Sequence, residues 1–264
     1  MSNKAKIRED AISLNPIDDA LFMKMAEDIR FCQEILQVIL NDDGLKVLNN
    51  TPQFTAKNMQ GRSCILDLKC QLGDGRLVDV EVQKANDDNH QKRVLYNTAL
   101  MITNTVDPKD KFEQVPDVIA VFISAFDMFN QGKTMYHIDR VIRETGAVIS
   151  NGMEEVYVNA AVDDKSDVAE LMKVFTEDNI YNDVKFPITS EIKRRFKTTE
   201  EGVSEMCEVI ERNRAEAAIE ATIEEKKKNV IGMIKEGLGL DLISRVTSLT
   251  VEQITAIGKQ AALL

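Results

Sequence analysis

Histidine is scarce in this chain, and its scarcity excludes several kinds of catalysis. Only two histidines occur among the 264 residues, and the chain contains no Gly-x-Ser-x-Gly sequence. A Ser-His-Asp or Cys-His mechanism is therefore not supported. The chain also lacks a Gly-x-x-x-x-Gly-Lys sequence. Because that loop cradles the phosphates of nucleotides, neither nucleoside-triphosphate hydrolysis nor a nucleotide cofactor is expected.

Cysteine is sparse as well, and its spacing carries no metal signature. The four cysteines form no Cys-x-x-Cys pair; they are Cys32, Cys64, Cys70 and Cys207. With so few histidines and no paired cysteines, neither a structural zinc site nor a disulfide framework is indicated. A reducing cytoplasm is the simplest setting for such a chain.

Long apolar runs are missing, which argues against a membrane protein. The longest candidate, Val118–Phe126, is bounded by Pro116 and Asp127. It is far shorter than the roughly 18–20 residues needed to span a bilayer, and it predicts a buried strand. No apolar segment follows the first polar residues, so no secretory signal is expected.

Positive charge is in deficit, since the formal net charge is −11. A protein this acidic is repelled from nucleic acid on average, because phosphate contacts need Lys and Arg. Two basic clusters are nevertheless present, one at Lys69, Lys84, Lys92 and Arg93 and the other within residues 193–197. They indicate either a local basic groove or a solvated charged face.

The stretch from Ile65 to Lys84 predicts two strands joined by a tight turn. Gly73-Asp74-Gly75 supplies the turn, because Asp-Gly between alternating runs is a strong hairpin signal. In the second strand the polar side chains share one face, since side chains alternate with period two; they are Asp79, Glu81 and Gln83.

One acidic residue, Asp67, interrupts the apolar first strand, and the hairpin places it opposite Glu81. A carboxylate there is costly to bury unless a cation or hydrogen bonds compensate it. Two carboxylates converging from adjacent strands form a natural site for a divalent metal with oxygen ligands.

An Asp, a hairpin and then Glu-x-Gln resemble the motif of the PD-(D/E)XK nucleases. The pattern is closest to the transposase-like branch, the Rpn-type recombination-promoting nucleases. Asp67 matches the first acidic position, Glu81 the second, and Gln83 the Lys position. The resemblance covers residues 13–160 and includes three further segments: Asn15–Phe22 resembles the D-x-x-F helix, Arg93–Tyr96 the R-x-x-Y helix, and Pro116–Phe126 the following strand.

The resemblance implies an α/β (α+β) fold with a restriction-endonuclease-like core, in which helices flank a central mixed sheet. We expect this core over residues 1–162 and a helical C-terminal region over residues 163–264. Within that region a helix is expected over residues 200–236, whose thin apolar stripe suits packing against a partner and favours a dimer. Two short helices follow, either a helix-turn-helix or a small helical pair; the lack of a basic recognition helix favours the pair.

The other expected elements follow from periodicity and capping residues. Helices are predicted from about residue 17 and over residues 29–40, 90–103, 166–175 and 190–196. Strands are predicted over residues 45–48, 53–58, 134–142 and 153–158. Residues 1–12 are polar and are expected to be loosely held.

The resemblance further implies a metal-dependent DNA endonuclease that serves transposition or recombination. Asp67, Glu81 and the carbonyl of Val82 would hold Mg²⁺, with Mn²⁺ as a substitute, and Gln83 would orient water or contact the phosphate. Asp19, Lys84 and Arg93 are further candidates for DNA contact or support of the site. Glu34 is expected to be a solvated side chain rather than an extra ligand, and His90 a surface or capping residue.

A non-enzymatic alternative stays open from sequence. The amide of Gln83 brings no positive charge where the motif usually has Lys. Together with the acidic surface, this favours an inactive nuclease fold that serves as a binding or assembly module. The paired carboxylates, Asp67 and Glu81, argue the other way, because an inactive site has no need of them.

Overall fold

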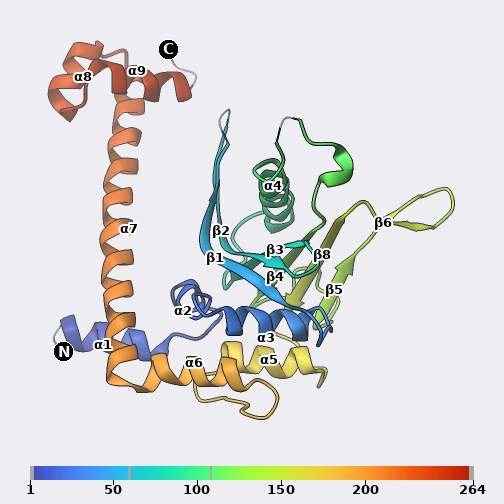
Figure 1. Ribbon diagram of the computed structural model, residues 1–264. Helices are drawn as coiled ribbons and strands as arrows, with labels where there is room; N and C mark the ends of the chain where they lie inside the picture. Colours follow the sequence, from blue (N-terminus) through green and yellow to red (C-terminus); the bar gives the residue numbers. More distant parts are fainter. Residues whose placement is uncertain (1–2, 59–60, 108, 262–264) are drawn as a thin grey trace. The chain divides into compact units, whose positions relative to one another are not determined.

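One mixed sheet of six strands forms the centre of the first part of the chain (Figure 1). The computed structural model describes residues 3–58, 61–107 and 109–261. Across the sheet the strands follow the order β1-β2-β3-β4-β8-β5. Their bounds are β1 (Val47–Ala56), β2 (Cys64–Leu72), β3 (Leu77–Gln83), β4 (Val118–Ser124), β8 (Met153–Asn159) and β5 (Met135–Ile138). The predicted fold class, a mixed central sheet flanked by helices, is confirmed.

The middle of this sheet is parallel. β3 pairs in parallel with β4, and β4 pairs in parallel with β8, whereas the remaining neighbours pair antiparallel. All seven residues of β4 are buried. This is the behaviour of a strand inside a parallel sheet that helices cover on both faces. The central strand predicted at Val118–Phe126 is confirmed.

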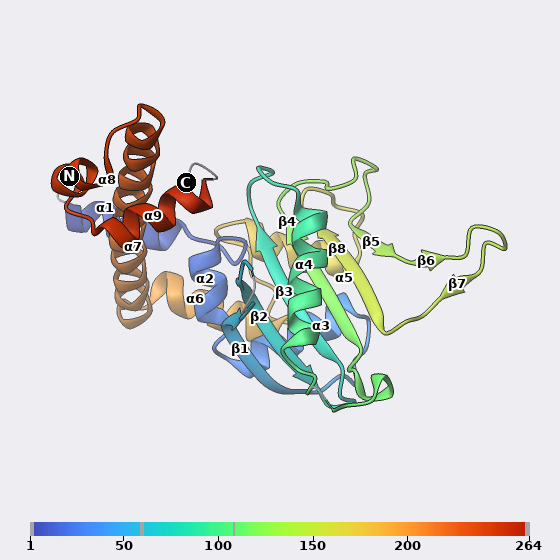
Figure 2. The same cartoon turned by 90° about the horizontal axis from the view of Figure 1, so that it is seen from above.

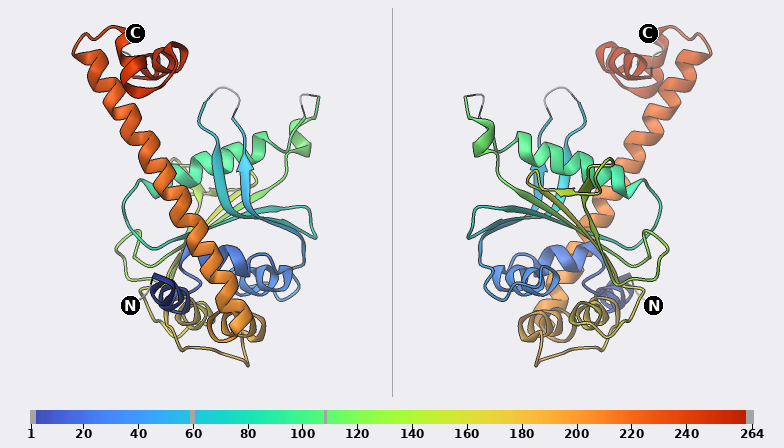
Figure 3. Two further views of the ribbon diagram at one scale, coloured as in Figure 1. Left: turned by 90° about the vertical axis from the view of Figure 1, so that its left-hand side faces the viewer. Right: turned by 90° about the vertical axis from the view of Figure 1, so that its right-hand side faces the viewer.

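Helices cover both faces of the sheet (Figure 2). α4 lies on one face, and α2 and α3 lie on the other with α5 and α6 beyond them (Figure 3). The bounds are α1 (Asn3–Ser13), α2 (Asp19–Met25), α3 (Ile29–Ile39), α4 (His90–Thr103), α5 (Asp167–Thr176) and α6 (Pro187–Thr198). Three aromatic rings join α2, α3 and α5: Phe31 lies 5.9 Å from Phe22 and 6.2 Å from Phe175 between centroids.

Side-chain caps explain where several helices begin. Asp28, Asn89 and Ser166 each accept a hydrogen bond from a backbone N–H of the first turn that follows. Such caps satisfy donors that have no partner inside the helix. The helices predicted over residues 29–40, 90–103 and 166–175 are confirmed within one residue at each end.

The N-terminal segment differs from its prediction. Residues 1–12 were expected to be loosely held, yet Asn3–Ser13 forms the helix α1. Ile7 and Ala11 are buried, and they lie four residues apart on one face. The other two apolar residues of the helix, Ala5 and Ile12, fall on a different side, so the sequence shows no single apolar face, which is why the helix escaped prediction.

Three strand predictions also need correction. The segments predicted at residues 45–48 and 53–58 are one strand, β1, whose pairing with β2 shifts register between Val47 and Asn49. The strand predicted over residues 134–142 is divided: β5 ends at Ile138, and β6 (Arg140–Val141) pairs instead with β7 (Val148–Ile149) in a separate ribbon. A short helix, η1 (Phe112–Gln114), precedes β4.

A buried lysine on α6 forms hydrogen bonds with the C-terminal end of α5. The Lys193 side chain has no solvent exposure, and its Nζ donates to the carbonyls of Val174 at 2.8 Å, Ile180 at 3.2 Å and Glu177. Val174 and Glu177 belong to the C-terminal end of α5, where carbonyls lack helical partners. Burial lowers the pKa of Lys193 to about 8.

Replacing this lysine should destabilise the fold. Lys193→Met removes the lysine donor from all three carbonyls and leaves Glu177 only the long bond from the Ile180 N–H at 3.5 Å, and unsatisfied buried acceptors cost about 1–3 kcal/mol each. We expect an overall loss of about 3 kcal/mol in the free energy of unfolding, measured by urea titration. Lys173→Met removes a surface lysine that pairs with Asp163 and serves as the control. Equal stability of the two variants would show that the Lys193 contacts contribute nothing.

The chain divides into two compact units, Met1–Cys207 and Glu208–Leu264. The helix α7 (Glu200–Lys235) contributes to both. The division falls after the predicted boundary at residue 162, because α5 and α6 pack against α3 and belong to the first unit. That residues 1–162 form the core domain stays a prediction.

The second unit has a small core of its own. α8 (Leu240–Thr247) and α9 (Val251–Gln260) pack with the end of α7 around Val230, Ile243 and Ile254. Thr250 begins α9 with a capping box. The predicted pair of short helices, and the capping box of the second, are confirmed.

Even α7, with its 36 residues, has no apolar stretch suited to crossing a bilayer. The same holds for the other helices within the described ranges.

Candidate active site

Asp67 and Glu81 meet where β2 and β3 separate. The regular pairing of the two strands ends at Leu68 and Val80. Just beyond that point, the N–H of Val82 donates to the Asp67 carboxylate at 2.9 Å, and the N–H of Asp67 donates to Glu81 at 3.3 Å. The two carboxylates therefore replace backbone acceptors and hold the ends of the strands together.

Arg93 and Asn97 donate hydrogen bonds to the Glu81 carboxylate from the helix α4. Both residues lie on α4, four positions apart and so on one face of the helix. Arg93 Nη2 donates to Glu81 Oε2 at 2.7 Å, and Asn97 Nδ2 donates to Oε1 at 3.2 Å. Arg93 Nη1 also donates to the amide oxygen of Gln83 at 3.0 Å. One guanidinium thus joins two of the motif positions.

The electrostatics of this pair are unfavourable without a cation. Burial raises the pKa of Asp67 well above its ordinary value, and the neighbouring Glu81 raises it further. Burial also raises the pKa of Glu81, although Arg93 opposes the shift. The Asp67 and Glu81 carboxylates repel one another, so an added positive charge would lower the free energy of the ionised pair.

The residues present fit a hard divalent cation. Carboxylate oxygens and a backbone carbonyl are the ligands that Mg²⁺ prefers, and this ion commonly keeps several waters with only one or two carboxylates. Within the described ranges no three acidic, cysteine or histidine side chains form a metal-binding group. A cation here would therefore rest on Asp67, Glu81 and the Val82 carbonyl, with water and phosphate completing its shell.

Asp79 is a third carboxyl beside this pair, and the sequence prediction of the site did not include it. Its side chain is 1% exposed, and neither oxygen finds a donor among the described residues. Burial and then Glu81 raise its pKa well above the ordinary value. The signal was available, because Asp79 precedes Glu81 by two residues and so shares its face of β3. In the register of β2 and β3, Asp79 lies opposite Lys69. The Lys69 Nζ lies 4.3 Å from the centroid of the Phe54 ring.

The two acidic residues of the D-x-x-F segment, Asp18 and Asp19, have different surroundings. Asp19 reaches the same cleft as the carboxylate pair, and burial raises its pKa. Asp18 instead forms an ion pair with Lys84 at 2.6 Å. Phe22 is fully buried in the aromatic cluster. Lys84, predicted as a DNA contact, thus has its charge compensated and does not line the cleft.

A cleft of about 720 Å³ opens over the carboxylates. It brings together six of the seven residues predicted for the site, namely Asp19, Asp67, Glu81, Val82, Gln83 and Arg93. Nine further residues that the prediction did not assign to the site also line it, among them Arg62, Lys92, Tyr96 and the acidic Asp88. The cleft therefore combines an acidic floor with basic residues contributed from two different parts of the chain.

The tyrosine of the R-x-x-Y segment holds the opposite side of this cleft. Tyr96 OH donates to the backbone carbonyl of Arg62, and the Asn58 amide donates to the Tyr96 oxygen at 3.1 Å. Arg93 and Tyr96 lie three residues apart on α4. Arg93 therefore binds the motif while Tyr96 binds the segment just before β2.

Two predictions outside the motif are wrong. Glu34 was expected to be solvated, but its carboxylate accepts hydrogen bonds from the N–H groups of Ile188 and Thr189 at the start of α6. His90 was expected at the surface or as a cap, but it is buried beside Phe122 and Phe126 while Asn89 caps α4. Burial lowers the pKa of His90.

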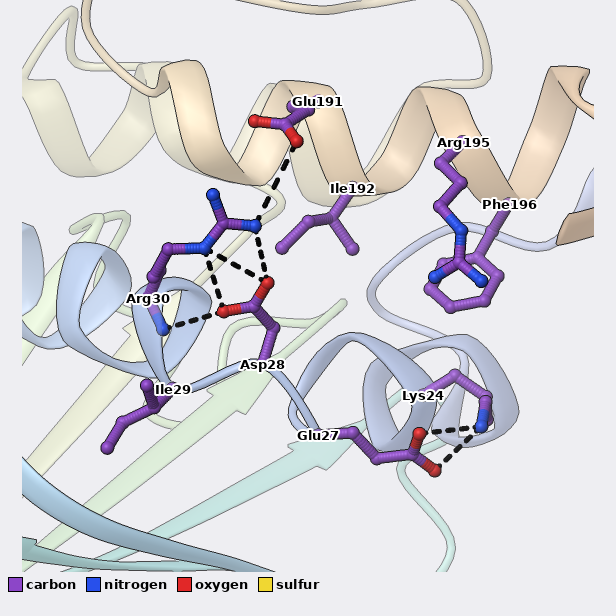
Figure 4. Close-up of a pocket in the computed structure, with 9 residues that line it drawn as sticks. All are labelled: Lys24, Glu27, Asp28, Ile29, Arg30, Glu191, Ile192, Arg195 and Phe196. Carbon is purple, nitrogen blue, oxygen red and sulfur yellow. Dashed lines mark hydrogen bonds and ion pairs between the residues drawn. The ribbon is translucent and has the colours of Figure 1, made fainter.

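The second predicted basic cluster is not a free cationic surface. Arg194 pairs with Asp183, Arg195 with Glu205, and Lys197 with Asp178, while Lys193 is buried. A pocket of about 450 Å³ beside it is lined by α6, by the end of α2, by the start of α3 and by the turn between them (Figure 4). In Figure 4 its lysine and Arg30 face acidic neighbours, Lys24 with Glu27 and Arg30 with Asp28. These compensated charges leave little attraction for phosphate.

The family comparison agrees with this geometry. The model of the PD-(D/E)XK nuclease family transposase matches residues 29–234, which include β2, β3 and α4. The chain therefore belongs to this family, and it is a nuclease-fold protein related to transposition. No curated protein and no solved structure matches the chain.

Proposed function

We propose that this protein is a Mg²⁺-dependent DNA endonuclease that hydrolyses phosphodiester bonds during transposition or recombination. The observation that carries the proposal is the convergence of buried Glu81 and half-buried Asp67 at the separation of β2 and β3. Two repelling carboxylates at the floor of an open cleft raise the free energy of the fold. Binding of a catalytic cation offsets that cost.

The roles of the residues follow from their contacts. Asp67, Glu81 and the carbonyl of Val82 would hold Mg²⁺, or Mn²⁺ in its place. The bound ion would polarise the scissile phosphate and lower the pKa of the attacking water. Gln83 carries no charge, so it would position water or phosphate rather than neutralise charge. Arg93 forms an ion pair with Glu81 at 2.7 Å. It would supply the positive charge that Gln83 lacks at the Lys position of the motif.

Cleavage of supercoiled plasmid tests this proposal. We expect nicked and linear products with Mg²⁺ or Mn²⁺ and none with a chelator. A parallel series with single-stranded circles and RNA identifies the substrate. Metal-independent cleavage, or none under any of these conditions, would contradict the proposal.

The cation should also stabilise the fold, and more so at higher pH. Because the pKa values of Asp67 and Glu81 are raised, these groups favour folding most below their unfolded values near 4. That contribution is lost as the pH rises through the raised pKa values. The cation must displace these protons, so the melting-temperature gain with Mg²⁺ should be larger at about pH 8 than at about pH 5. At a hundredfold excess over Kd the gain corresponds to about 2.7 kcal/mol. An equal gain at both pH values would place the cation elsewhere.

The alternative function is an inactive nuclease fold that binds or assembles without cleavage. The engagement of Gln83 by Arg93 and Ala85 favours it, because this amide is already occupied. Under this alternative the plasmid assay shows no product, and Mg²⁺ leaves the melting temperature unchanged.

We further propose a dimer that forms through α7. Ile219 and Ile223 lie four residues apart on this helix and are 60% and 47% exposed. A duplex cut on both strands needs two active sites, which a dimer supplies. Light scattering should give a dimer mass for the parent and a monomer mass for Ile219→Glu/Ile223→Glu. The control Glu216→Gln/Glu220→Gln changes neighbouring helix residues and should stay dimeric. A monomeric parent would contradict this proposal.

A cytoplasmic setting remains our proposal for location. All four cysteines are free, and Cys32 and Cys70 are buried. Free buried thiols suit a reducing compartment.

A further inference from the structure

The basic residues around the motif differ in whether an acidic side chain compensates them. Lys84 pairs with Asp18, and Arg93 pairs with Glu81 at 2.7 Å. Arg62 and Lys92 are both exposed at the cleft, and neither forms an ion pair with any described residue. In a chain with a net charge of −11, two uncompensated cations beside a carboxylate floor identify where a phosphate can approach.

Arg62 and Lys92 reach the cleft from different elements. Lys92 lies in the first turn of α4, one residue before Arg93. Arg62 lies just before β2, in the part of the chain that Tyr96 holds through its hydrogen bond to the Arg62 carbonyl. Tyr96 therefore fixes the backbone of Arg62 relative to the helix that carries Lys92.

We propose that Arg62 and Lys92 form a two-sided clamp for the phosphodiester backbone of nucleic acid, and that Tyr96 is the positioning residue that holds Arg62 in this clamp. The inference rests on the proposed nuclease function and deepens it, since it names the residues that bring the backbone over Asp67 and Glu81. Because phosphate contacts carry no sequence information, a clamp of this kind confers affinity without sequence preference.

The salt dependence of binding tests the clamp directly. Each phosphate contact adds about 0.9 to the slope of log Kobs against log salt on duplex DNA and about 0.7 on a single strand. Arg62→Ala/Lys92→Ala should therefore lower the slope by about 1.8 on duplex or about 1.4 on single-stranded DNA. Fluorescence anisotropy with labelled DNA, the full chain and EDTA measures this slope without cleavage.

A matched double variant controls for the change in net charge. Lys173→Ala/Arg194→Ala removes the same two charges, but these residues pair with Asp163 and Asp183 and do not line the cleft. It should leave the slope unchanged. An equal decrease in slope for both double variants would overturn the clamp, because it would reflect net charge alone.

The positioning role of Tyr96 predicts a specific dependence on Arg62. Tyr96→Phe keeps the ring and every charge but loses the hydroxyl, so it should weaken binding and lower the slope by less than about 0.9. In the Arg62→Ala background the same substitution should have no further effect on either quantity. Additive effects of the two substitutions would overturn the positioning role.

These results separate the clamp from the nuclease proposal. If the parent cleaves plasmid with Mg²⁺ while Arg62→Ala/Lys92→Ala keeps the parental slope, the clamp is wrong and the nuclease function stands. If no protein cleaves but the slope falls as expected, the clamp stands and the nuclease function fails.

Discussion

Asp67→Asn should abolish metal-dependent cleavage while leaving the fold intact or more stable. The substitution removes one of two anionic ligands, and metal ions supply several kcal/mol of transition-state stabilisation. We expect kcat/KM to fall on the order of 10³-fold, since each 1.36 kcal/mol is a factor of ten. The stability should not fall, because an Asn oxygen still accepts from the N–H of Val82 and the repulsion from Glu81 is gone.

The opposite signs of these effects make the test specific. A substitution that merely damages the fold lowers activity and melting temperature together. Asp43→Asn, at an exposed position after α3, is the control and should change neither quantity. If Asp67→Asn kept the parental activity, Asp67 would not belong to the active site. If the variant instead had a much lower melting temperature, the role of Asp67 would be structural only.

Arg93→Met should be the most destabilising change in the cleft. Glu81 is 2% exposed and loses its only ion-pair partner among the described residues. Removing one member of a buried pair costs about 3–5 kcal/mol. Because the Arg93 side chain is 31% exposed and partly screened, we expect the lower end, about 3 kcal/mol in urea titrations. Loss of the guanidinium also releases Gln83, so cleavage should fall with stability.

A double-mutant cycle identifies the cause of this loss. Glu81→Gln in the Arg93→Met background removes the uncompensated charge and should recover part of the stability without recovering cleavage. Arg93→Lys keeps the charge but cannot span Glu81 and Gln83 together, so it should retain more stability than Arg93→Met. If Glu81→Gln and Arg93→Met destabilise additively, the two side chains do not interact as the structure indicates.

The carboxylate pair was predictable because local rules determine it. The turn at Gly73–Gly75 sets the hairpin register, and Gly75 indeed has φ of +95°, which favours glycine. That register places Asp67 opposite Glu81 once the strands are recognised. Arg93 was predicted because its helix resembles the R-x-x-Y helix of the family, and in the structure Arg93 reaches Glu81 of the motif.

Other contacts depend on tertiary packing and carried no signal in the sequence. Glu34 meets the start of α6 across 154 positions of chain, and only the packing of α3 on α6 brings them together. Arg62 enters the cleft because Tyr96, 34 residues later, binds its carbonyl. The basic residues at 193–197 resembled a binding surface, yet burial and ion pairs compensate them. Local charge patterns show which residues are cationic, and packing decides which of them are free.

Binding of Mn²⁺ to the metal-free protein is the measurement that tests the central claim most directly. The paramagnetic signal of free Mn²⁺, followed during titration, reports the number of bound ions without any substrate. We predict saturable binding to the parent that both Asp67→Asn and Glu81→Gln abolish, while Asp43→Asn keeps it. Undiminished binding in both site variants, or no binding to the parent, would contradict a metal site at Asp67 and Glu81.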